Sequence, residues 1–326
     1  MPDPQTRELL DRLGDMTRSW ARDHASADIG ALRAYASDIF AAFAGPERDL
    51  TAFTRRDIRT GPTSRSRPAR LYRPLGDGIP PIIMFFHGGG WALGGLDEYD
   101  GLVGSLCALS GAALVSVDYR LAPEHPFPAG LDDAVAATEW VARHADALGV
   151  DADRLAVMGD SAGGNLAGVI AHEALARGGP LIVAQYLLYP VLDVATPDDA
   201  FPSRMAFGNG DLFLTRGAIA QSAERYLIPG QRADDARVSP LLAGSLAGLP
   251  PALILCGSHD PLLDESVRYA ERLSAAGVST QLEVIDGGVH AFLSFGTLDL
   301  AQRGRRIVAD HVRRTLIPNA GGFLRP

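Results

Sequence analysis

Short apolar segments alternate with segments of helical periodicity through most of this 326-residue chain. Parallel strands need a crossover helix between them, so this alternation indicates a mostly parallel sheet covered by helices on both faces. The apolar segments are 81–87, 112–119, 154–159, 182–190, 251–257 and 280–286. The helical segments are 129–147, 162–177, 263–276 and 297–316. The sequence therefore predicts an α/β fold.

Two parts of the chain depart from the alternation. Residues 6–21 and 28–44 place apolar side chains at helical spacing ahead of the first apolar strand, and an extended region follows them. Residues 192–250 then interrupt the alternation of strands and helices, with one expected helix at 215–227. An insertion of this length in an α/β sheet is more typical of a lid or cap than of a disordered linker.

The composition excludes several classes of function. A formal net charge of −9 disfavours binding to the phosphates of nucleic acids. All basic charge comes from arginine, and a chain without lysine cannot form a Schiff base, build a P-loop or use a Ser-x-x-Lys nucleophile. Cys107 and Cys256 lie far apart in apolar segments, so we expect two buried thiols and no zinc site. No signal-like or membrane-spanning segment is present, so we expect a cytoplasmic protein.

A single serine, Ser161, stands between two glycines where the predicted strand 154–159 meets the predicted helix 162–177, in the sequence GDSAG. A tight strand-to-helix turn needs small neighbours, because its backbone packs closely and the serine adopts strained dihedral angles. The turn lifts the hydroxyl above the sheet edge, at the positive end of a helix where developing negative charge is favoured. Ser161 is therefore the candidate nucleophile.

A glycine-rich turn, HGGG (87–90), follows the first apolar strand directly. Glycines let backbone N–H groups face a cavity without obstruction from side chains. An oxyanion hole built here would use the N–H groups of Gly88 and Gly89, with Ala162 as a third donor. We expect His87 to shape this loop by hydrogen bonding rather than to catalyse.

Two polar side chains follow late strands of the predicted sheet. Asp260 follows the strand 251–257, where it could also cap the next helix, and His290 follows the strand 280–286. Asp264 is an alternative carboxylate, but it lies inside the next helix rather than at the end of the strand. Serine, aspartate and histidine then occur in the chain order of a hydrolase triad.

With these residues in place, the chain resembles the hormone-sensitive-lipase-like serine esterases (bacterial family IV) of the α/β-hydrolase fold. The motifs HGGGWALGGLDEYD, VSVDYRLAPEHPFPAGLDD, GDSAGGNLA, HDPLLDES and GGVHAF carry the resemblance. It implies a mostly parallel eight-stranded sheet with a helical cap, no metal or cofactor, and the possibility of a homodimer. It also implies a triad of Ser161, Asp260 and His290, with oxyanion donors Gly88, Gly89 and Ala162.

The resemblance further implies where the cap lies. We expect N-terminal cap helices in 1–48 and a cap insertion in 192–236, with the catalytic core in 49–191 and 237–326. One departure is Ala291, because the family often has glycine after the catalytic histidine. Several apolar residues are candidates for lining the substrate pocket, although each is explained equally well as core: Trp91, Phe207, Phe213, Leu214, Leu262 and Phe292.

The expected function is hydrolysis of short- to medium-chain acyl esters through an acyl-enzyme intermediate. The substrate is then a small molecule, and neither nucleic acid nor stable membrane insertion is involved. Three alternatives remain open: a lipase on longer acyl chains, an amidase or lactonase, and a non-catalytic ligand receptor on the same fold. Receptors of this kind tend to lose a triad member, whereas all three candidates are present here.

Overall fold

The computed structural model describes residues 2–24, 28–45, 52–63 and 66–317. Within these ranges the chain forms an eight-stranded sheet in the order β1-β2-β4-β3-β5-β6-β7-β8. The strands are β1 (Phe53–Thr60), β2 (Arg67–Pro74), β3 (Pro81–Phe86), β4 (Ala113–Val117), β5 (Asp151–Asp160), β6 (Ala184–Leu188), β7 (Ala252–His259) and β8 (Thr280–Val289). The predicted fold class, a mostly parallel eight-stranded sheet flanked by helices, is confirmed.

The strand directions bring several turns to one edge of the sheet. Only β2 runs against its neighbours β1 and β4, and all pairs from β4 across to β8 are parallel. Carboxyl ends of parallel strands meet at a common edge, which is where ligands bind in open α/β sheets. The turns after β3, β5, β7 and β8 therefore lie along the same edge.

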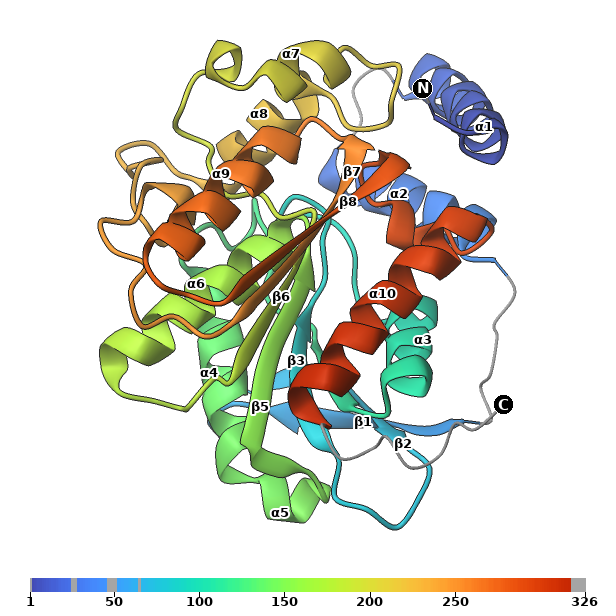
Figure 1. Cartoon of the computed structure of the whole chain (residues 1–326). Helices are drawn as coiled ribbons and strands as arrows, with labels where there is room; N and C mark the ends of the chain where they lie inside the picture. The colour runs from blue at the N-terminus through green and yellow to red at the C-terminus, as the bar shows by residue number, and fades with distance from the viewer. Residues whose placement is uncertain (1, 25–27, 46–51, 64–65, 318–326) are drawn as a thin grey trace.

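Helices cover both faces of the sheet (Figure 1), and a hydrophobic core lies under each layer. Leu102 and Val308 belong to one core, and Leu131, Leu166 and Tyr269 belong to the other. One face carries α3 (Asp100–Ser110) and α10 (Asp299–Leu316). The opposite face carries α4 (Ala129–Arg143), α6 (Ala162–Arg177) and α9 (Leu263–Ala275), with α5 (Ala145–Leu148) after α4.

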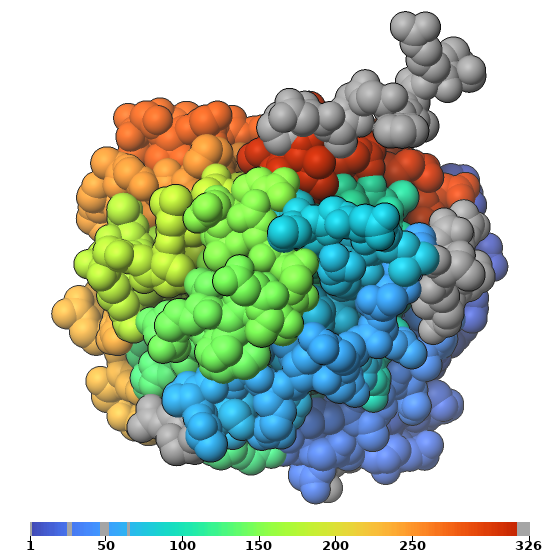
Figure 2. Space-filling model, turned by 90° about the horizontal axis from the view of Figure 1, so that it is seen from below, coloured from blue at the N-terminus to red at the C-terminus, as the bar shows by residue number. Residues whose placement is uncertain are grey.

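Four further helices lie toward the upper end of the molecule in Figure 1. They are α1 (Pro4–Asp23), α2 (Ile29–Phe43), α7 (Pro202–Phe207) and α8 (Arg216–Tyr226). Side chains of Asp3, Asp28 and Thr215 accept a hydrogen bond from the first turn of α1, α2 and α8, which explains where these helices begin. Figure 2 shows the molecule from below, where segments coloured cyan to green occupy the centre of the face. Short 3-10 turns complete the described chain at Asp198–Ala200, Pro240–Leu242 and Phe292–Ser294.

The structure refines several bounds expected from sequence. The stretch 129–147 is two helices, because α4 ends at Arg143 and α5 begins at Ala145. The strand before Ser161 starts earlier than expected, at Asp151, and β8 continues as far as Val289, directly before His290. Cys107 and Cys256 are both buried free thiols, as predicted. Among the helices the structure describes, none is long and apolar enough to cross a lipid bilayer.

Candidate active site

The turn between β5 and α6 holds Ser161 in a strained conformation. Its φ is 53° and its ψ is −119°, a region that residues other than glycine rarely occupy. The flanking glycines leave no room for side chains. A Cβ on Gly159 would lie 2.1 Å from the carbonyl oxygen of Gly163, and a Cβ on Gly163 would lie 1.9 Å from that of Phe86. Close packing of this turn therefore forces the conformation that presents the serine hydroxyl at the strand ends.

Three side chains from three turns form one chain of hydrogen bonds. His290 Nε2 lies 2.9 Å from Ser161 Oγ, and His290 Nδ1 lies 2.9 Å from Asp260 Oδ2. An ionised carboxylate only accepts, so Nδ1–H donates to Asp260 and the unprotonated Nε2 accepts from the serine hydroxyl. The exposed fraction is 9% for Ser161, 3% for His290 and 0% for Asp260. The structure thus brings together the three residues that the sequence singled out.

Asp260 and Asp264 have different partners, which separates the two carboxylates considered from sequence. The second oxygen of Asp260 accepts from the backbone N–H of Leu262 at 2.9 Å, which fixes the carboxylate toward His290. Asp264 instead accepts from the backbone N–H of Ser203 at 2.6 Å and so anchors α7 to the start of α9. The geometry favours Asp260 as the partner of the imidazole.

The glycine-rich turn after β3 departs from the sequence expectation at one amide. The N–H of Gly88 donates to Asp160 Oδ1 at 2.8 Å and lies 3.1 Å from the Tyr99 hydroxyl. A donor that is engaged inside the protein does not stabilise an oxyanion, so the prediction for Gly88 is wrong. Within the described part of the chain, the N–H groups of Gly89 and Ala162 have no acceptor.

Asp160, the residue before the nucleophile, is a functional-site residue that sequence reasoning missed. It is fully buried, and its second oxygen accepts from the Tyr99 hydroxyl at 3.1 Å. Burial raises the pKa of Asp160 to about 7, although the hydrogen bonds from Tyr99 and Gly88 act in the opposite direction. The only signal in the sequence was an acidic residue inside the GDSAG turn. Structurally, Asp160 joins the nucleophile turn to the glycine-rich turn.

Comparison with known families places the whole of this site in one family. A family model described as "alpha/beta hydrolase fold" matches residues 83–294, which include every residue of the hydrogen-bonded chain above. The chain belongs to this family. In this α/β hydrolase the matched segment runs from β3 to the turn after β8, so it contains all the strand ends that carry polar side chains.

Individual relatives narrow the family resemblance to enzymes named as ester hydrolases. The chain is 43% identical over 273 residues to the carboxylic ester hydrolase LipN of Mycobacterium tuberculosis, covering 82% of this chain and 71% of the relative. It is 38% identical over 257 residues to an ethyl acetate hydrolase of Pseudomonas putida, covering 76% and 79%. A solved ester hydrolase from the metagenome of Lake Arreo superposes with a TM-score of 0.89 at 33% identity, covering 96% of this chain and 98% of that one. The predicted resemblance to serine esterases of the α/β-hydrolase fold is confirmed.

The six candidate pocket residues of this α/β hydrolase divide into two groups. Trp91, Leu262 and Phe292 are at most 2% exposed and belong to the hydrophobic cores. The Trp91 ring stacks on Tyr226 of α8 with the ring centroids 4.3 Å apart, so it joins the glycine-rich turn to that helix. These three residues act mainly in packing, and the pocket role predicted for them has no support from their burial.

The other three candidates lie in the segment 192–236. Phe207 and Leu214 are partly buried, and Phe213 is 38% exposed. The Phe213 ring meets the edge of Phe295 at 5.3 Å, and its backbone φ is 75°. An exposed aromatic ring held in a left-handed conformation is unusual for a simple core residue. A pocket role for these three residues stays a prediction.

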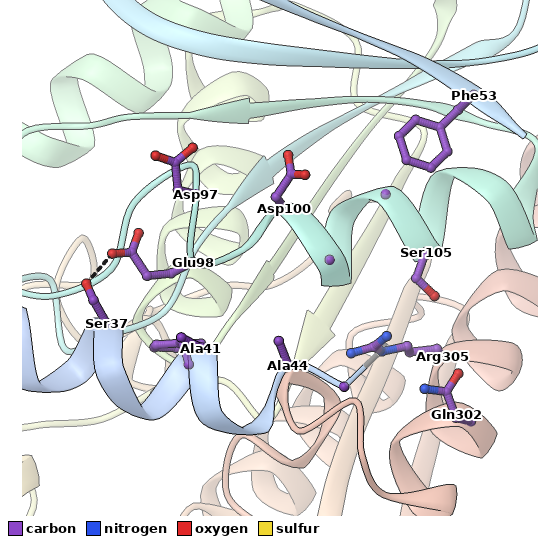
Figure 3. Close-up of a pocket in the computed structure, with 14 residues that line it drawn as sticks. Ser37, Ala41, Ala44, Phe53, Asp97, Glu98, Asp100, Ser105, Gln302 and Arg305 are labelled. Carbon is purple, nitrogen blue, oxygen red and sulfur yellow. Dashed lines mark hydrogen bonds between the residues drawn. The ribbon is translucent and has the colours of Figure 1, made fainter. Parts of the chain in front are cut away.

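A cavity of about 310 Å³ lies elsewhere in the molecule, between α2, α3 and α10 (Figure 3). Asp97, Glu98 and Asp100 line one side, and Gln302 and Arg305 line another. No residue of the Ser161 hydrogen-bond chain is in its lining. The cavity is therefore separate from the candidate active site.

The backbone conformation of the residue after His290 explains the departure noted in the sequence. Ala291 has φ 60° and ψ 16°, in the left-handed region. Glycine occupies this region without steric cost, whereas alanine is strained there by about 1 kcal/mol. A position with this backbone conformation readily accounts for a preference for glycine. The strain at Ala291 stands directly beside His290.

Proposed function

We propose that this α/β hydrolase cleaves carboxylic esters by acyl transfer to Ser161. The class of reaction is shown by relatives named carboxylic ester hydrolase and carboxylesterase at 43% identity, so the chain is a serine carboxylesterase. The single observation that carries the assignment of roles is the continuous contact from Ser161 through His290 to Asp260, 2.9 Å at each step. That spacing is the reach required of a nucleophile, its general base and the group that orients the base.

The proposed chemistry has two halves. Ser161 Oγ attacks the ester carbonyl while His290 Nε2 takes the hydroxyl proton, and Asp260 stabilises the imidazolium that forms. The tetrahedral intermediate collapses with loss of the alcohol, which receives the proton from His290. Water then repeats the sequence on the acyl-serine, with His290 again as base, and the carboxylic acid leaves. No metal or cofactor takes part in these steps.

The oxyanion donors of the proposal differ from those expected from sequence. The N–H groups of Gly89 and Ala162 remain as donors, and the N–H of Gly90 replaces that of Gly88. Gly90 has φ 59° and, like Gly89, makes no hydrogen bond from its N–H to another described residue. Ala162 is the first residue of α6, where backbone N–H groups are unpaired and favour negative charge. Loss of one such donor costs about 3–4 kcal/mol of transition-state stabilisation in other enzymes.

The substrate proposed is a small ester with a short to medium acyl chain. One relative is named an ethyl acetate hydrolase, and ethyl acetate is a small ester with a short acyl chain. We also propose that 1–48 and 192–236 form a cap, since α1, α2, α7 and α8 lie toward one end of the molecule (Figure 1). Exposed Phe213 and partly buried Phe207 and Leu214 would then contact the acyl chain. A cytoplasmic location and a homodimer remain predictions.

A series of p-nitrophenyl esters from C2 to C16 tests this proposal. We expect the highest kcat/KM between C2 and C8, and Ser161→Ala should lose all but a trace of turnover because the nucleophile acts as one unit with His290. A maximum at C12 or longer would support the lipase alternative instead. Turnover that survives in Ser161→Ala would contradict the proposed mechanism, and the same enzyme assayed on p-nitroacetanilide would reveal amidase activity.

A further inference from the structure

Arg33 of α2 contacts the loop that follows the glycine-rich turn. Its Nε donates to the carbonyl oxygen of Ala92 at 2.9 Å, and one Nη donates to the carbonyl oxygen of Ala122 at 3.1 Å. Both Nη groups also bind the carboxylate of Glu124, at 2.8 and 2.7 Å. The guanidinium thus joins an N-terminal helix to two segments of the core that are remote in sequence.

Two more residues on the same face of α2 contact the far end of that loop. Ser37 and Phe40 follow Arg33 at intervals of four and three residues, which places all three side chains on one face of the helix. The Ser37 hydroxyl donates to the carboxylate of Glu98 (Figure 3). The Phe40 ring lies 5.1 Å from the ring of Tyr99, whose hydroxyl contacts Asp160. One face of α2 therefore contacts both ends of the loop, through Arg33 at its start and through Ser37 and Phe40 at its end.

The loop contacted by Arg33 is hydrogen-bonded to the peptide group that carries a proposed oxyanion donor, the N–H of Gly90. The N–H groups of Ala92 and Leu93 donate to the carbonyl oxygen of Gly89, at 3.1 and 2.9 Å. The carbonyl of Trp91 accepts from Ala122 N–H at 2.9 Å. Arg33 binds the carbonyl of Ala92, whose own N–H binds Gly89. The carbonyl of Gly89 and the N–H of Gly90 belong to one planar peptide group, so a shift of the loop at Ala92 would move the N–H of Gly90.

Apart from these hydrogen bonds, little restricts the backbone conformation at Gly89. Its φ of 106° lies in a region open to glycine alone, and a glycine adopts many conformations unless neighbouring contacts restrict it. On one side the turn is held by the hydrogen bond from Gly88 to Asp160. On the other side it is held through Ala92 and Trp91, which are the residues that Arg33 and Ala122 fix. Arg33 is the contact on this second side that comes from outside the catalytic core.

We propose that Arg33 is a positioning residue for the oxyanion hole: from α2 it fixes the loop 91–93 and thereby the peptide group between Gly89 and Gly90, which carries the N–H of Gly90. This inference rests on the proposed function, since it assumes that the N–H of Gly90 stabilises an oxyanion. It assigns the N-terminal helix a part in transition-state stabilisation beyond covering the site. A donor displaced by a fraction of an ångström is weakened rather than lost, so the effect on rate is smaller than that of deleting a donor.

Arg33→Lys and Arg33→Gln test this proposal. Lysine keeps a positive charge for Glu124, but a single ammonium cannot reach Glu124, Ala92 and Ala122 in the geometry of the planar guanidinium. We expect both variants to lower kcat about tenfold on p-nitrophenyl butyrate with KM within about twofold, because the lost interaction is one made in the transition state. The Ki of an alkyl trifluoromethyl ketone, which forms an oxyanion adduct on an active serine, should rise by about the same factor.

Two control variants separate this role from a purely structural one. Arg18→Gln removes an exposed arginine that pairs with Asp15 on α1, and it should leave both constants unchanged. Glu124→Gln leaves the contacts of Arg33 with Ala92 and Ala122 in place, so its kcat should stay closer to that of the wild type than the kcat of Arg33→Gln.

The outcome that overturns the proposal is a wild-type kcat and ketone Ki in Arg33→Lys, even if Arg33→Gln lowers the melting temperature. That pattern would mean that the arginine serves only to hold α2 by charge. A rise in KM alone would also overturn it. Failure of the underlying ester hydrolase mechanism is recognised separately, because turnover would then persist in Ser161→Ala.

Discussion

At the scale of single residues, the active site depends on backbone strain. Ser161, which carries the nucleophile, and Ala291, which follows His290, both have positive φ, at 53° and 60°. Non-glycine residues in this region cost about 1–3 kcal/mol and persist where surrounding structure forces them. The strain is balanced by close packing of Gly159 and Gly163 and by the buried hydrogen bonds of Asp260. Residues that present the reacting atoms are therefore held by their neighbours.

A buried carboxyl group predicts a pH effect on stability at the residue scale. Burial raises the pKa of Asp160 from 3.8 to about 7, so the folded protein binds a proton there that the unfolded chain has already lost. Between about pH 4 and 7 this group therefore makes stability fall as the pH rises. The neutral amide introduced by Asp160→Asn would resemble the protonated carboxyl, so the variant should gain about 2–4 kcal/mol relative to the wild type between pH 5 and pH 8.

Urea unfolding of both proteins at the two pH values measures this gain. A constant difference between wild type and Asp160→Asn at pH 5 and pH 8 would show that Asp160 ionises at its ordinary pKa. Activity assays on the same samples report whether the hydrogen bond from Gly88 to residue 160 is kept, since the asparagine carbonyl can accept it.

At the scale of elements, the sequence pattern predicted the strands and helices that flank the site but not every element. Continuous apolar runs identified β3 to β7, because strands buried on both faces carry little polar sequence. Strand β8 is more polar and only partly buried over its first half. The charged sequences of β1 and β2 indicate only an extended conformation, since most of their residues are exposed or partly buried and they contain no continuous apolar run. Helix α7 has six residues, too few for a periodic signal, and its position is fixed by contacts with α9.

Helix α8 gives a prediction at the element scale. Tyr226 stacks on Trp91 and meets the edge of Phe127, yet its buried hydroxyl has no partner among the residues described. Tyr226→Phe should therefore leave stability nearly unchanged, whereas Tyr226→Ala should cost about 3–5 kcal/mol, as other large aromatic deletions do. Thermal unfolding and kcat on p-nitrophenyl butyrate check both variants.

Two results would contradict the packing role given to Tyr226. One is a loss of more than about 2 kcal/mol in Tyr226→Phe, which would reveal a hydrogen bond from the hydroxyl. The other is a wild-type kcat in Tyr226→Ala, because the stacked Trp91 belongs to the loop that follows the glycine-rich turn.

At the scale of the whole molecule, segments distant in sequence are joined at a few buried polar contacts. Arg204 of α7 and Glu265 of α9 form an ion pair of 2.9 Å with side-chain exposures of 2% and 0%. Glu265 also accepts from the backbone N–H groups of Leu192 and Asp193, at the start of the long insertion. Burial raises the pKa of Glu265 to about 7 even with Arg204 beside it. This pair fixes the insertion to the core beside the turn that carries Asp260.

Removing the arginine should destabilise the whole chain. Arg204→Met leaves Glu265 buried without its counter-charge, and loss of one partner of such a pair costs about 3–5 kcal/mol. The cost should be larger at pH 8 than at pH 5, because the uncompensated carboxylate is protonated at the lower pH. Adding Glu265→Gln should recover part of the loss. Urea unfolding of the single and double variants measures these differences, and equal losses at both pH values would contradict the raised pKa of Glu265.

The arrangement of the whole molecule shows which features of the site could be predicted from the sequence and which could not. Chain order and strand ends were enough to predict the meeting of Ser161, Asp260 and His290, because parallel strands bring their carboxyl ends to one edge. The direction of an amide was not predictable in the same way. Gly88 donates to Asp160 because the two turns approach each other in space, and no local pattern encodes that approach. The contact of Arg33 with Ala92 spans 59 positions and is equally invisible in the sequence.

The most direct test of the account is to trap the intermediate it requires. Wild-type protein mixed with p-nitrophenyl butyrate and quenched in acid during turnover should carry a butyryl group on the peptide that contains Ser161, as seen by mass spectrometry of the digest. His290→Ala should show no adduct in the same time, because its serine lacks a base. Steady turnover by the wild type with no acyl group at Ser161, or with the group on another residue, would contradict the account.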